Sequence, residues 1–411
     1  MKIMLIAGAR PNFMKIASII DAIDVHNQHA NHPIDYLLVH TGQHYDGQMS
    51  QAFFEDLALP QPDVDLEVGS SSHAVQTAEI MKRFEPVLIR EQPHVVIVVG
   101  DVNSTIACSL VASKMIYPRS TSSLCTLRPL VVHVEGGLRS FDRSMPEEIN
   151  RILTDAISDL IFITEESAVE NLLREGIPRE RVHFVGNTMV DTLIKHKERC
   201  QSSKILGRLG LGTDRNNPLE TKKQGKEVMS YALITLHRPS NVDKLEIFQE
   251  ILEALSTIAE YIPVIFPVHP RTMNRIKEFR LEKYFAFVTT EEGKLETGVP
   301  CVNCVEPLGY LDFLCLMSNA KLVLTDSGGI QEETSVLGIP CLTLRQNTER
   351  PITITHGTNV LVGTKKEDII RHALGKINQP PEAKQPRFWD GKAGQRIIKV
   401  LTEKFRTINE Q

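Results

Sequence analysis

Strand-like and helix-like segments alternate along most of this 411-residue chain, and this alternation restricts the fold more than any other feature. The run Val95–Val99 consists entirely of β-branched residues, as expected for a strand buried on both faces. Helical patterns separate such runs, which is typical of parallel strands joined by crossover helices. The first half is therefore predicted to form a parallel sheet wrapped by helices.

The same alternation restarts after a polar segment at residues 206–228, which we interpret as linker and surface loop. Two similar α/β halves predict two Rossmann-like, doubly wound domains with the site in the cleft between them. We place the first domain at residues 1–200 and the second at 201–386. A final helix at about 392–405, within a segment 387–411, is expected to pack back on the first domain. Expected strands are 2–7, 35–40, 95–99, 130–134, 160–164, 182–185, 231–236, 263–266, 322–325 and 341–344, and expected helices are 12–26, 74–91, 102–115, 146–157, 166–175, 244–260, 308–318 and one after Gly329.

Composition excludes several classes of protein. The net charge is −5 with both signs interspersed, so nucleic acid is not expected as a partner. No apolar run approaches the roughly 20 residues that span a bilayer, and the N-terminus leads directly into a strand without signal-peptide features. We therefore expect no membrane association and a cytoplasmic location.

The seven cysteines are odd in number and irregularly spaced. Cys301 and Cys304 have the spacing of a metal or redox pair, but no second pair or suitable His lies nearby and the motif opens no helix. We interpret them as reduced and structural, with a metal site as the alternative.

The segment Thr325–Glu333 combines a strand end, a Gly-Gly turn and a helix start, and thus predicts a phosphate cradle. Backbone N–H groups and the helix dipole favour an anion there, and Gly328 and Gly329 allow close approach, next to Ser327. Glu332 and Glu333 are placed in the first helical turn. Glu333 could reach a ribose diol, and Arg350 could pair with phosphates through its planar fork. The alternative is a tight turn with Ser327 as a capping residue.

Charged side chains also follow the strands of the first half. Arg10 and Lys15 bracket the turn after the first strand and would suit a pyrophosphate, or else are surface charges. Asp101 and Glu135 end neighbouring strands, so the two carboxylates could raise one another's pKa and divide acid and base duties. Glu147 opens a helix, where an acidic residue also complements the dipole, and Arg151 one turn later is its natural partner.

His237 ends the first strand of the second half. A His at a strand end can carry protons near neutral pH, or can be a hydrogen-bonded structural residue. No ligand spacing supports a metal site. No Gly-x-Gly-x-x-Gly follows a strand and no P-loop is present, so no cofactor is expected.

These residues lie within motifs that together resemble the non-hydrolysing UDP-N-acetylglucosamine 2-epimerases. The matching blocks run from residue 8 to about 363 in family order. They are Gly8-Ala-Arg-Pro11 with Lys15, Thr41-Gly-Gln-His44, Gly100-Asp101, His133-Val-Glu-Gly-Gly-Leu-Arg139, Pro146-Glu-Glu-Ile-Asn-Arg151, Gly186-Asn-Thr188, His237-Arg238, Val268-His-Pro-Arg271, Pro307–Phe313, Thr325–Glu333 and Asn347-Thr-Glu-Arg-Pro351.

The resemblance implies a fold of the glycosyltransferase-B type, a homodimer, and the interconversion of UDP-GlcNAc and UDP-ManNAc for surface polysaccharide synthesis. The sugar would lose both UDP and the C2 proton, giving 2-acetamidoglucal. UDP would then add back, with the opposite configuration at C2. The family's UDP-binding residues correspond to Arg10, Lys15, Phe313, Ser327, Gly328, Gly329, Glu333 and Arg350, with Phe313 near the uracil. Its catalytic residues correspond to Asp101, Glu135, Glu147, Arg151 and His237.

The chain departs from the family pattern at two places. Asn12 stands where a Glu is common, and Pro239 and Ser240 precede Asn241 where many relatives have a Glu. These loops help to build an activating site in bacterial members, so allosteric activation is left open. The alternatives are epimerisation of UDP-2,3-diacetamido-2,3-dideoxy-glucuronate, a hydrolysing variant that releases ManNAc, a glycosyltransferase, and a nucleotide-sugar-binding regulator.

Overall fold

The computed structural model describes residues 1–42, 54, 56–117, 128–212, 229–290, 295–377 and 384–409. Its contacts divide the chain into two compact units: Met1–Thr192 with Arg387–Gln411, and Leu193–Pro386. Gln43, His44, residues 213–228 of the expected linker and Cys125 lie outside the described residues. None of the helices in the described part is long and apolar enough to cross a membrane.

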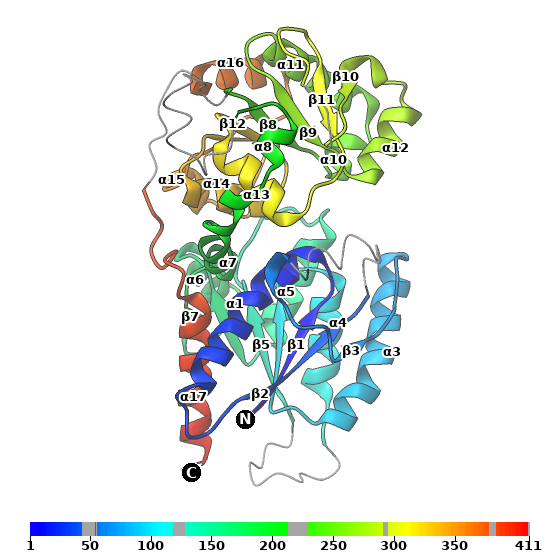
Figure 1. Ribbon diagram of the computed structural model, residues 1–411. Coiled ribbons are helices and arrows are strands. Elements are labelled where there is room, and N and C mark those ends of the chain that lie inside the picture. Colours follow the sequence, from blue (N-terminus) through cyan, green and yellow to red (C-terminus); the bar gives the residue numbers. More distant parts are fainter. Residues whose placement is uncertain are drawn as a thin grey trace. The chain divides into compact units, whose positions relative to one another are not determined.

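The first unit is built on a seven-stranded parallel sheet in the order β3-β2-β1-β4-β5-β6-β7. Alternate positions of the central strands, such as Met4 and Val96, are buried against α3 and α4, and α1 packs with α17 (Figure 1). The elements are β1 (Lys2–Ala7), α1 (Arg10–Asn27), β2 (Asp35–His40), β3 (Val64–Asp65), α3 (His73–Glu91), β4 (Val95–Val99), α4 (Asn103–Lys114), β5 (Leu130–Val134), α5 (Pro146–Ile157), β6 (Leu160–Ile163), α6 (Ser167–Arg174), β7 (Val182–Phe184), α7 (Thr188–His196) and α17 (Ala393–Asn409).

The second unit repeats this plan, with seven parallel strands in the order β10-β11-β9-β8-β12-β13-β14. Residues of α11 and α16 and the apolar strand positions form its large buried cluster. The elements are α8 (Ile205–Arg208), β8 (Ala232–Thr235), α10 (Pro239–Val242), α11 (Leu245–Ala259), β9 (Val264–Pro267), α12 (Pro270–Glu278), β10 (Phe285–Phe287), β11 (Val302–Val305), α13 (Tyr310–Asn319), β12 (Leu322–Thr325), α14 (Gly328–Leu337), β13 (Cys341–Thr343), α15 (Ile352–Thr355), β14 (Asn359–Leu361) and α16 (Lys366–Ile377).

Both sheets confirm the predicted α/β class with doubly wound parallel sheets. In each, the strand order reverses near the centre: between β1 and β4 in the first unit, and between β8 and β12 in the second. In the second sheet β11 also lies between β9 and the edge strand β10. Ligands of such sheets bind beyond the carboxyl ends of the strands that flank the central reversal. The turns after β1, β4, β8 and β12 are therefore the places to look for a site.

The C-terminal helix α17 packs on α1 in the first unit. A side chain at Gly394 would meet the backbone oxygen of Ser18 at 2.4 Å, so the two helices approach closely only because this residue is glycine. Trp389, fully buried, donates from Nε1 to the backbone oxygen of Thr164 at 3.0 Å. These contacts fasten the end of the chain to the N-terminal unit.

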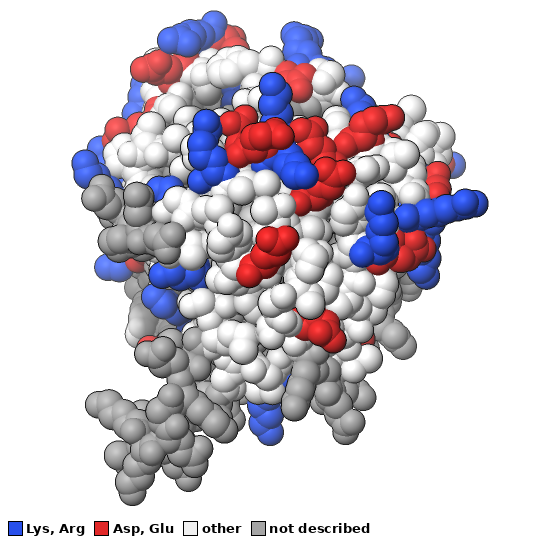
Figure 2. All heavy atoms as spheres, turned by 90° about the horizontal axis from the view of Figure 1, so that it is seen from above, with Lys and Arg blue, Asp and Glu red and all other residues white. Residues whose placement is uncertain are grey.

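One face of the molecule carries mixed rather than sorted charges. On the face shown in Figure 2, Lys and Arg side chains lie beside Asp and Glu, with uncharged areas between them. Several exposed helices of the second unit carry such neighbouring pairs, including Arg275 with Glu278 and Arg371 with Asp368. This surface has no broad area of one sign.

Candidate active-site turns

The turn after β1 is held by one amide side chain. Asn12 accepts hydrogen bonds from the backbone N–H groups of Gly8 and Ala9, both at 3.0 Å. Its Nδ2 donates to the backbone oxygen of Val99, at the end of β4, at 3.0 Å. An amide both donates and accepts here, which an ionised Glu does not do. The departure from the family pattern thus ties together the turns on either side of the sheet reversal.

The expected catalytic carboxylates after β4 and β5 each lie against a cation. Lys15 Nζ is 2.7 Å from Glu135, and both side chains are buried. Arg151 lies 2.8 Å from Asp101, whose side chain is 25% exposed. The two strands are neighbours, as the sequence predicted. The structure therefore shows two carboxylate–cation pairs side by side, whereas the sequence had suggested two carboxylates that perturb one another.

Glu135 also adopts a backbone conformation that is rare for its type. Its φ is +71°, in the left-handed region that costs a non-glycine residue about 1 kcal/mol or more. Such strain persists where surrounding structure enforces it, and it concentrates at functional sites. Glu67 of the same unit also has a positive φ but is exposed, whereas Glu135 combines this backbone with a buried side chain.

Helix α5 supplies the other charged residues of this region. Glu147 is half-buried, and Glu148 is almost fully buried. Arg151 forms ion pairs with Glu148 and Asp101, whereas the sequence had suggested Glu147 as its partner. Arg10 lies in the first turn of α1, and its side chain is outside the described part of the structure.

In the second unit, the helix after β12 begins earlier than the sequence indicated. Ser327 is the last extended residue and Gly328 is the first residue of α14, so no acidic residue lies in the first turn. The prediction that placed Glu332 and Glu333 there is wrong, because the Gly-Gly pair belongs to the helix itself. Ser327 makes no side-chain cap. The first amides of a helix have no partner within it, so Gly328 and Gly329 contribute N–H groups at the positive end of the dipole.

Three arginines and two glutamates surround this helix start. Arg345 lies 2.7 Å and Arg238 lies 3.4 Å from Glu349, and Arg350 lies 2.8 Å from Glu332. Burial alone would raise the pKa of Glu349, but the guanidiniums hold that pKa well below its usual range. Asp326, a buried carboxylate just before the helix, supplies a third negative charge. The helix amides and dipole, rather than an excess of positive charge, therefore favour an anion there. A methyl at Gly328 would lie 2.7 Å from Glu349, so an alanine there would force that carboxylate to shift.

His237 is placed by a buried carboxylate that follows β12 directly. Asp326 accepts from the backbone N–H groups of His237 and Arg238 at 3.1 and 3.0 Å, and from Asn241 at 3.2 Å. His237 Nδ1 lies 3.0 Å from Asp326, and the His side chain is 54% exposed. Burial would raise the pKa of Asp326, but His237 and the backbone donors lower it. The turn after β8 is thereby bonded to the turn after β12, across the reversal of the second sheet.

Glu333 is buried and carries an unusual titration. Burial raises its pKa to about 7, although the Tyr310 hydroxyl at 3.4 Å works in the opposite direction. Tyr310 begins α13, the helix that also carries the half-buried Phe313. Of the residues expected to bind UDP, Phe313, Glu333 and Arg350 therefore come from α13, α14 and the loop after β13 in the second unit, whereas Arg10 and Lys15 lie on α1 of the first unit.

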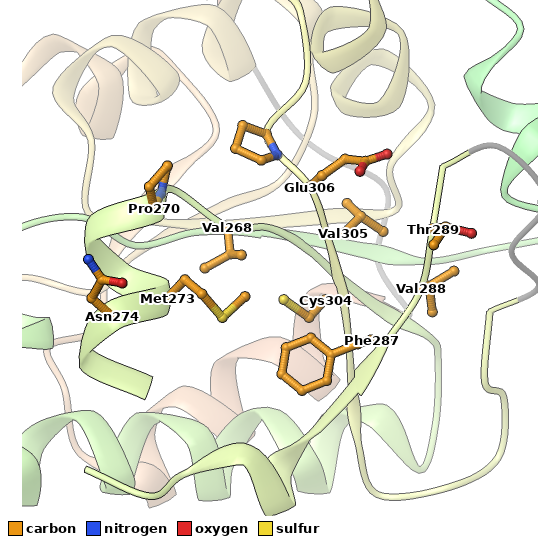
Figure 3. A pocket seen from close by; sticks show the side chains of 11 residues that line it. Val268, Pro270, Met273, Asn274, Phe287, Val288, Thr289, Cys304, Val305 and Glu306 are labelled. Atoms are coloured by element: carbon orange, nitrogen blue, oxygen red, sulfur yellow. The ribbon is translucent and has the colours of Figure 1, made fainter. Parts of the chain in front are cut away.

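A cavity of about 410 Å³ lies at the carboxyl ends of β9, β10 and β11. Figure 3 shows Met273, Phe287 and Cys304 pointing toward one another within it. Burial raises the pKa of Cys304 to about 12, so this thiol is not a reactive group at neutral pH. Among the described residues, no group of three or more His, Cys, Asp or Glu side chains is arranged to hold a metal ion.

Sequence reasoning missed the residues that hold these turns. They are Asn12, Glu148, Asp155, Tyr310, Asp326 and Glu349. Asp326 lies within the predicted phosphate cradle, directly after an expected strand. That position could have indicated a role at the site. Glu148, Tyr310 and Glu349 also lie within the family motifs, but the motifs do not indicate which residues they bond.

The fold and its turns define a class of protein: a two-unit α/β protein with a glycine helix start among arginines in one unit and paired carboxylates and cations in the other. Comparison with known proteins gives the family. The family model described as UDP-N-acetylglucosamine 2-epimerase matches residues 26–402. The chain belongs to this family.

The relatives span the whole chain. The UDP-N-acetylglucosamine 2-epimerase of Methanocaldococcus jannaschii is 42% identical, over 98% of this chain and 99% of its own length. Its crystal structure in complex with UDP-GlcNAc and UDP aligns with a TM-score of 0.80, over 98% of this chain and 100% of that one. The UDP-2,3-diacetamido-2,3-dideoxy-D-glucuronate 2-epimerase of Pseudomonas aeruginosa is 36% identical over 98% of this chain and 100% of its own length. The family's enzymes are isomerases that act on UDP-sugars.

Proposed function

We propose that this chain interconverts UDP-GlcNAc and UDP-ManNAc by eliminating UDP and adding it back. The observation that carries this proposal is the pair of carboxylate–cation contacts, Glu135 with Lys15 and Asp101 with Arg151, at adjacent strand ends. Proton transfer to and from C2 requires positioned acids and bases, and a protein that only binds nucleotide-sugars needs neither.

The second unit binds the UDP portion. The pyrophosphate lies at the start of α14 against Arg350, Ser327 and Gly329, where backbone amides and guanidiniums supply positive charge. Glu333 accepts from the ribose diol. Neighbouring strands are about 4.8 Å apart, so β9 is about 10 Å from β12. That span suits a uracil at the apolar cavity beside β9, with Phe313 on the adjacent helix.

The reaction then divides between the two units. A carboxylate of the first unit removes the C2 proton, and the C2–H electron pair forms the C1=C2 bond of 2-acetamidoglucal as the C1–O bond breaks. UDP carries away the electron pair of the C1–O bond, and Arg10, Lys15 and Arg350 stabilise its charge. Delivery of a proton to the other face of C2 and return of UDP to C1 give the epimer. The sum is redox-neutral and needs no cofactor.

The remaining candidates have stated parts in this scheme. Asp101, Glu135, Glu147 and His237 are the acid–base candidates, and Arg151 orients Asp101. Closure around the bound sugar retains the glucal and excludes water. We also propose a cytoplasmic homodimer that supplies a precursor of a surface polysaccharide.

Proton NMR of UDP-GlcNAc with the purified protein in D2O, without added cofactor, tests the proposal. We expect new UDP-ManNAc signals with deuterium at C2. Free ManNAc with UDP would indicate the hydrolysing variant. If the UDP-GlcNAc spectrum stays unchanged, the proposed substrate is wrong.

The 36% identity to an enzyme named for UDP-2,3-diacetamido-2,3-dideoxy-glucuronate makes that sugar the second candidate. The same D2O experiment on it distinguishes the two epimerases. Absence of exchange with both sugars would favour a transferase or a binding protein.

A further inference from the structure

Helix α5 buries only polar side chains. Its four buried residues are Glu148, Arg151, Thr154 and Asp155, while its apolar residues are half-buried or exposed. Glu148, Arg151 and Asp155 are spaced by three and four residues, so they form one stripe along the helix. Burying charges is costly and contributes little net stability even when they are paired. A surface helix normally buries an apolar stripe, and this reversal calls for a reason other than stability.

The N-terminal end of the stripe is a clamp centred on Glu148. Its Oε2 accepts from the backbone N–H of Ser140 at 3.0 Å, and its Oε1 accepts from that of Phe141 at 2.9 Å. Arg151, itself bonded to Asp101, donates to the same carboxylate. Phe141 is held at φ +58° with its ring 76% exposed. One buried carboxylate thus fixes both the loop after β5 and the arginine that orients Asp101.

The C-terminal end of the stripe is a second clamp centred on Asp155. Its Oδ2 accepts from the backbone N–H of Gly137 at 3.0 Å and from Arg139 at 2.7 Å. Its Oδ1 lies 2.7 Å from His133 Nδ1, and His133 Nε2 lies 2.7 Å from the backbone oxygen of Gly100. These bonds enclose Glu135 on both sides, at His133 and at Gly137. They also join its turn to the residue that precedes Asp101.

We infer that Glu148 and Asp155 are positioning residues: through the two clamps, the buried polar stripe of α5 holds Asp101 and the strained Glu135 in their reactive placement. The inference rests on the proposed function. Neither carboxylate needs to contact the sugar, because each acts through groups that it bonds. Loss of a clamp therefore lowers the rate of proton transfer and leaves UDP binding largely intact, because neither Glu148 nor Asp155 bonds a residue that is assigned to UDP.

The structure suggests variants that separate positioning from folding. The Glu148 carboxylate accepts from three donors: two backbone N–H groups and Arg151. Glu148→Gln keeps the shape of the side chain but replaces one accepting oxygen by an NH2 group, which cannot accept from them. Asp155→Asn can keep every bond, with its oxygen toward Gly137 and Arg139 and its NH2 toward a His133 that donates to Gly100. Asp155→Ala keeps none. Asp159→Asn is the matched control, since Asp159 accepts from the backbone N–H of Val131 and pairs with Arg128 away from the carboxyl ends of the strands.

The experiment measures kcat, KM and UDP affinity for each variant. We expect Glu148→Gln and Asp155→Ala to lower kcat at least tenfold, with the Kd for UDP within threefold of wild type. Asp155→Asn should return kcat to within about threefold, and Asp159→Asn should leave kcat unchanged. The inference is overturned if Glu148→Gln costs no more kcat than Asp159→Asn does.

A double-mutant cycle checks that Glu148 acts through Asp101. In an Asp101→Asn background, Glu148→Gln should change the residual rate less than twofold, because the group that it positions is already disabled. A full additional tenfold loss would contradict the inference, and this cycle decides the matter even if Asp155→Ala fails to fold. If the wild type exchanges no C2 proton with either UDP-sugar, the proposed function itself fails. Normal wild-type turnover with an unaffected Glu148→Gln variant overturns only the positioning inference.

Discussion

The two units share a sheet plan but present different chemistry at their strand ends. In the N-terminal unit the turns carry buried ion pairs, Lys15 with Glu135 and Arg151 with Asp101, on a partly left-handed backbone. In the C-terminal unit the corresponding place is a helix start with Gly328 and a surrounding arginine cluster. One set of groups can transfer protons, and the other can hold an anion. The comparison teaches that two copies of one sheet plan can carry different chemistry, and the proposed function assigns a different part of the reaction to each.

The largest expected effect comes from removing a proton-transfer group of the first unit. Glu135→Gln should lower kcat about 10³-fold, because general acid–base catalysis typically contributes 10²–10⁴-fold. The Kd for UDP should change less than about threefold. Steady-state kinetics and calorimetric UDP titration measure the two. The control is Glu165→Gln, because Glu165 is a buried carboxylate that follows β6. An equal loss of kcat in this variant would contradict a special role of Glu135 in proton transfer.

The second expected effect is on stability and belongs to the C-terminal unit. A pKa of Glu333 raised from 4.5 to about 7 means that the folded state binds more protons than the unfolded state between these pH values. The wild type should therefore lose up to about 3 kcal/mol of unfolding free energy as pH rises from 4.5 to above 7. Glu333→Gln should remove that loss and be the more stable protein at pH 8. Urea unfolding at pH 5 and pH 8 measures this, and parallel pH profiles for the two proteins would contradict it.

A smaller effect is expected from changing the shape of a cation while keeping its charge. Arg350→Lys replaces a planar fork with a point charge, so the Kd for UDP should rise by about 10- to 100-fold. The matched control is Arg128→Lys, at a bidentate pair with Asp159 in the first unit. Calorimetry with UDP alone measures this Kd. An unchanged Kd would contradict a role of Arg350 in UDP binding and would leave it a structural role in its pair with Glu332.

The smallest expected effect is steric. Gly328→Ala places a methyl 2.7 Å from Glu349 and should weaken UDP binding about tenfold by shifting that carboxylate. Gly207→Ala has open space around it and should leave the Kd unchanged. A Kd for Gly328→Ala equal to wild type would mean that the helix start is looser than its contacts indicate.

The sequence was sufficient for the long, periodic elements. Strands β4 and β5 and helix α5 begin and end where predicted, because continuous β-branched runs and a Pro at the helix start are strong local signals. The edge strands β3, β10 and β14 were missed, since two or three residues carry no period. Strand β11 was missed because Asn303 and Cys304 interrupt its apolar pattern.

The candidate site was predictable only in part. The sequence placed Asp101 and Glu135 at the ends of neighbouring strands. This prediction needed only the order of the strands, which follows from the alternation of strands and helices along the chain. Their cationic partners and the clamps at Glu148 and Asp155 depend on side-chain packing between segments that no local pattern links. The start of α14 was misplaced because a Gly-Gly pair, usually a turn signal, lies inside the first helical turn.

Positional isotope exchange tests the proposed elimination and re-addition of UDP most directly. UDP-GlcNAc carrying 18O in the bridge between C1 and the β-phosphorus would be incubated with the protein in D2O and followed by 31P and proton NMR. Elimination frees the β-phosphate to rotate, so the account predicts that 18O moves to non-bridging positions while deuterium enters C2. Deuterium at C2 with the 18O still entirely in the bridge would contradict it, because the C1–O bond would then have remained intact.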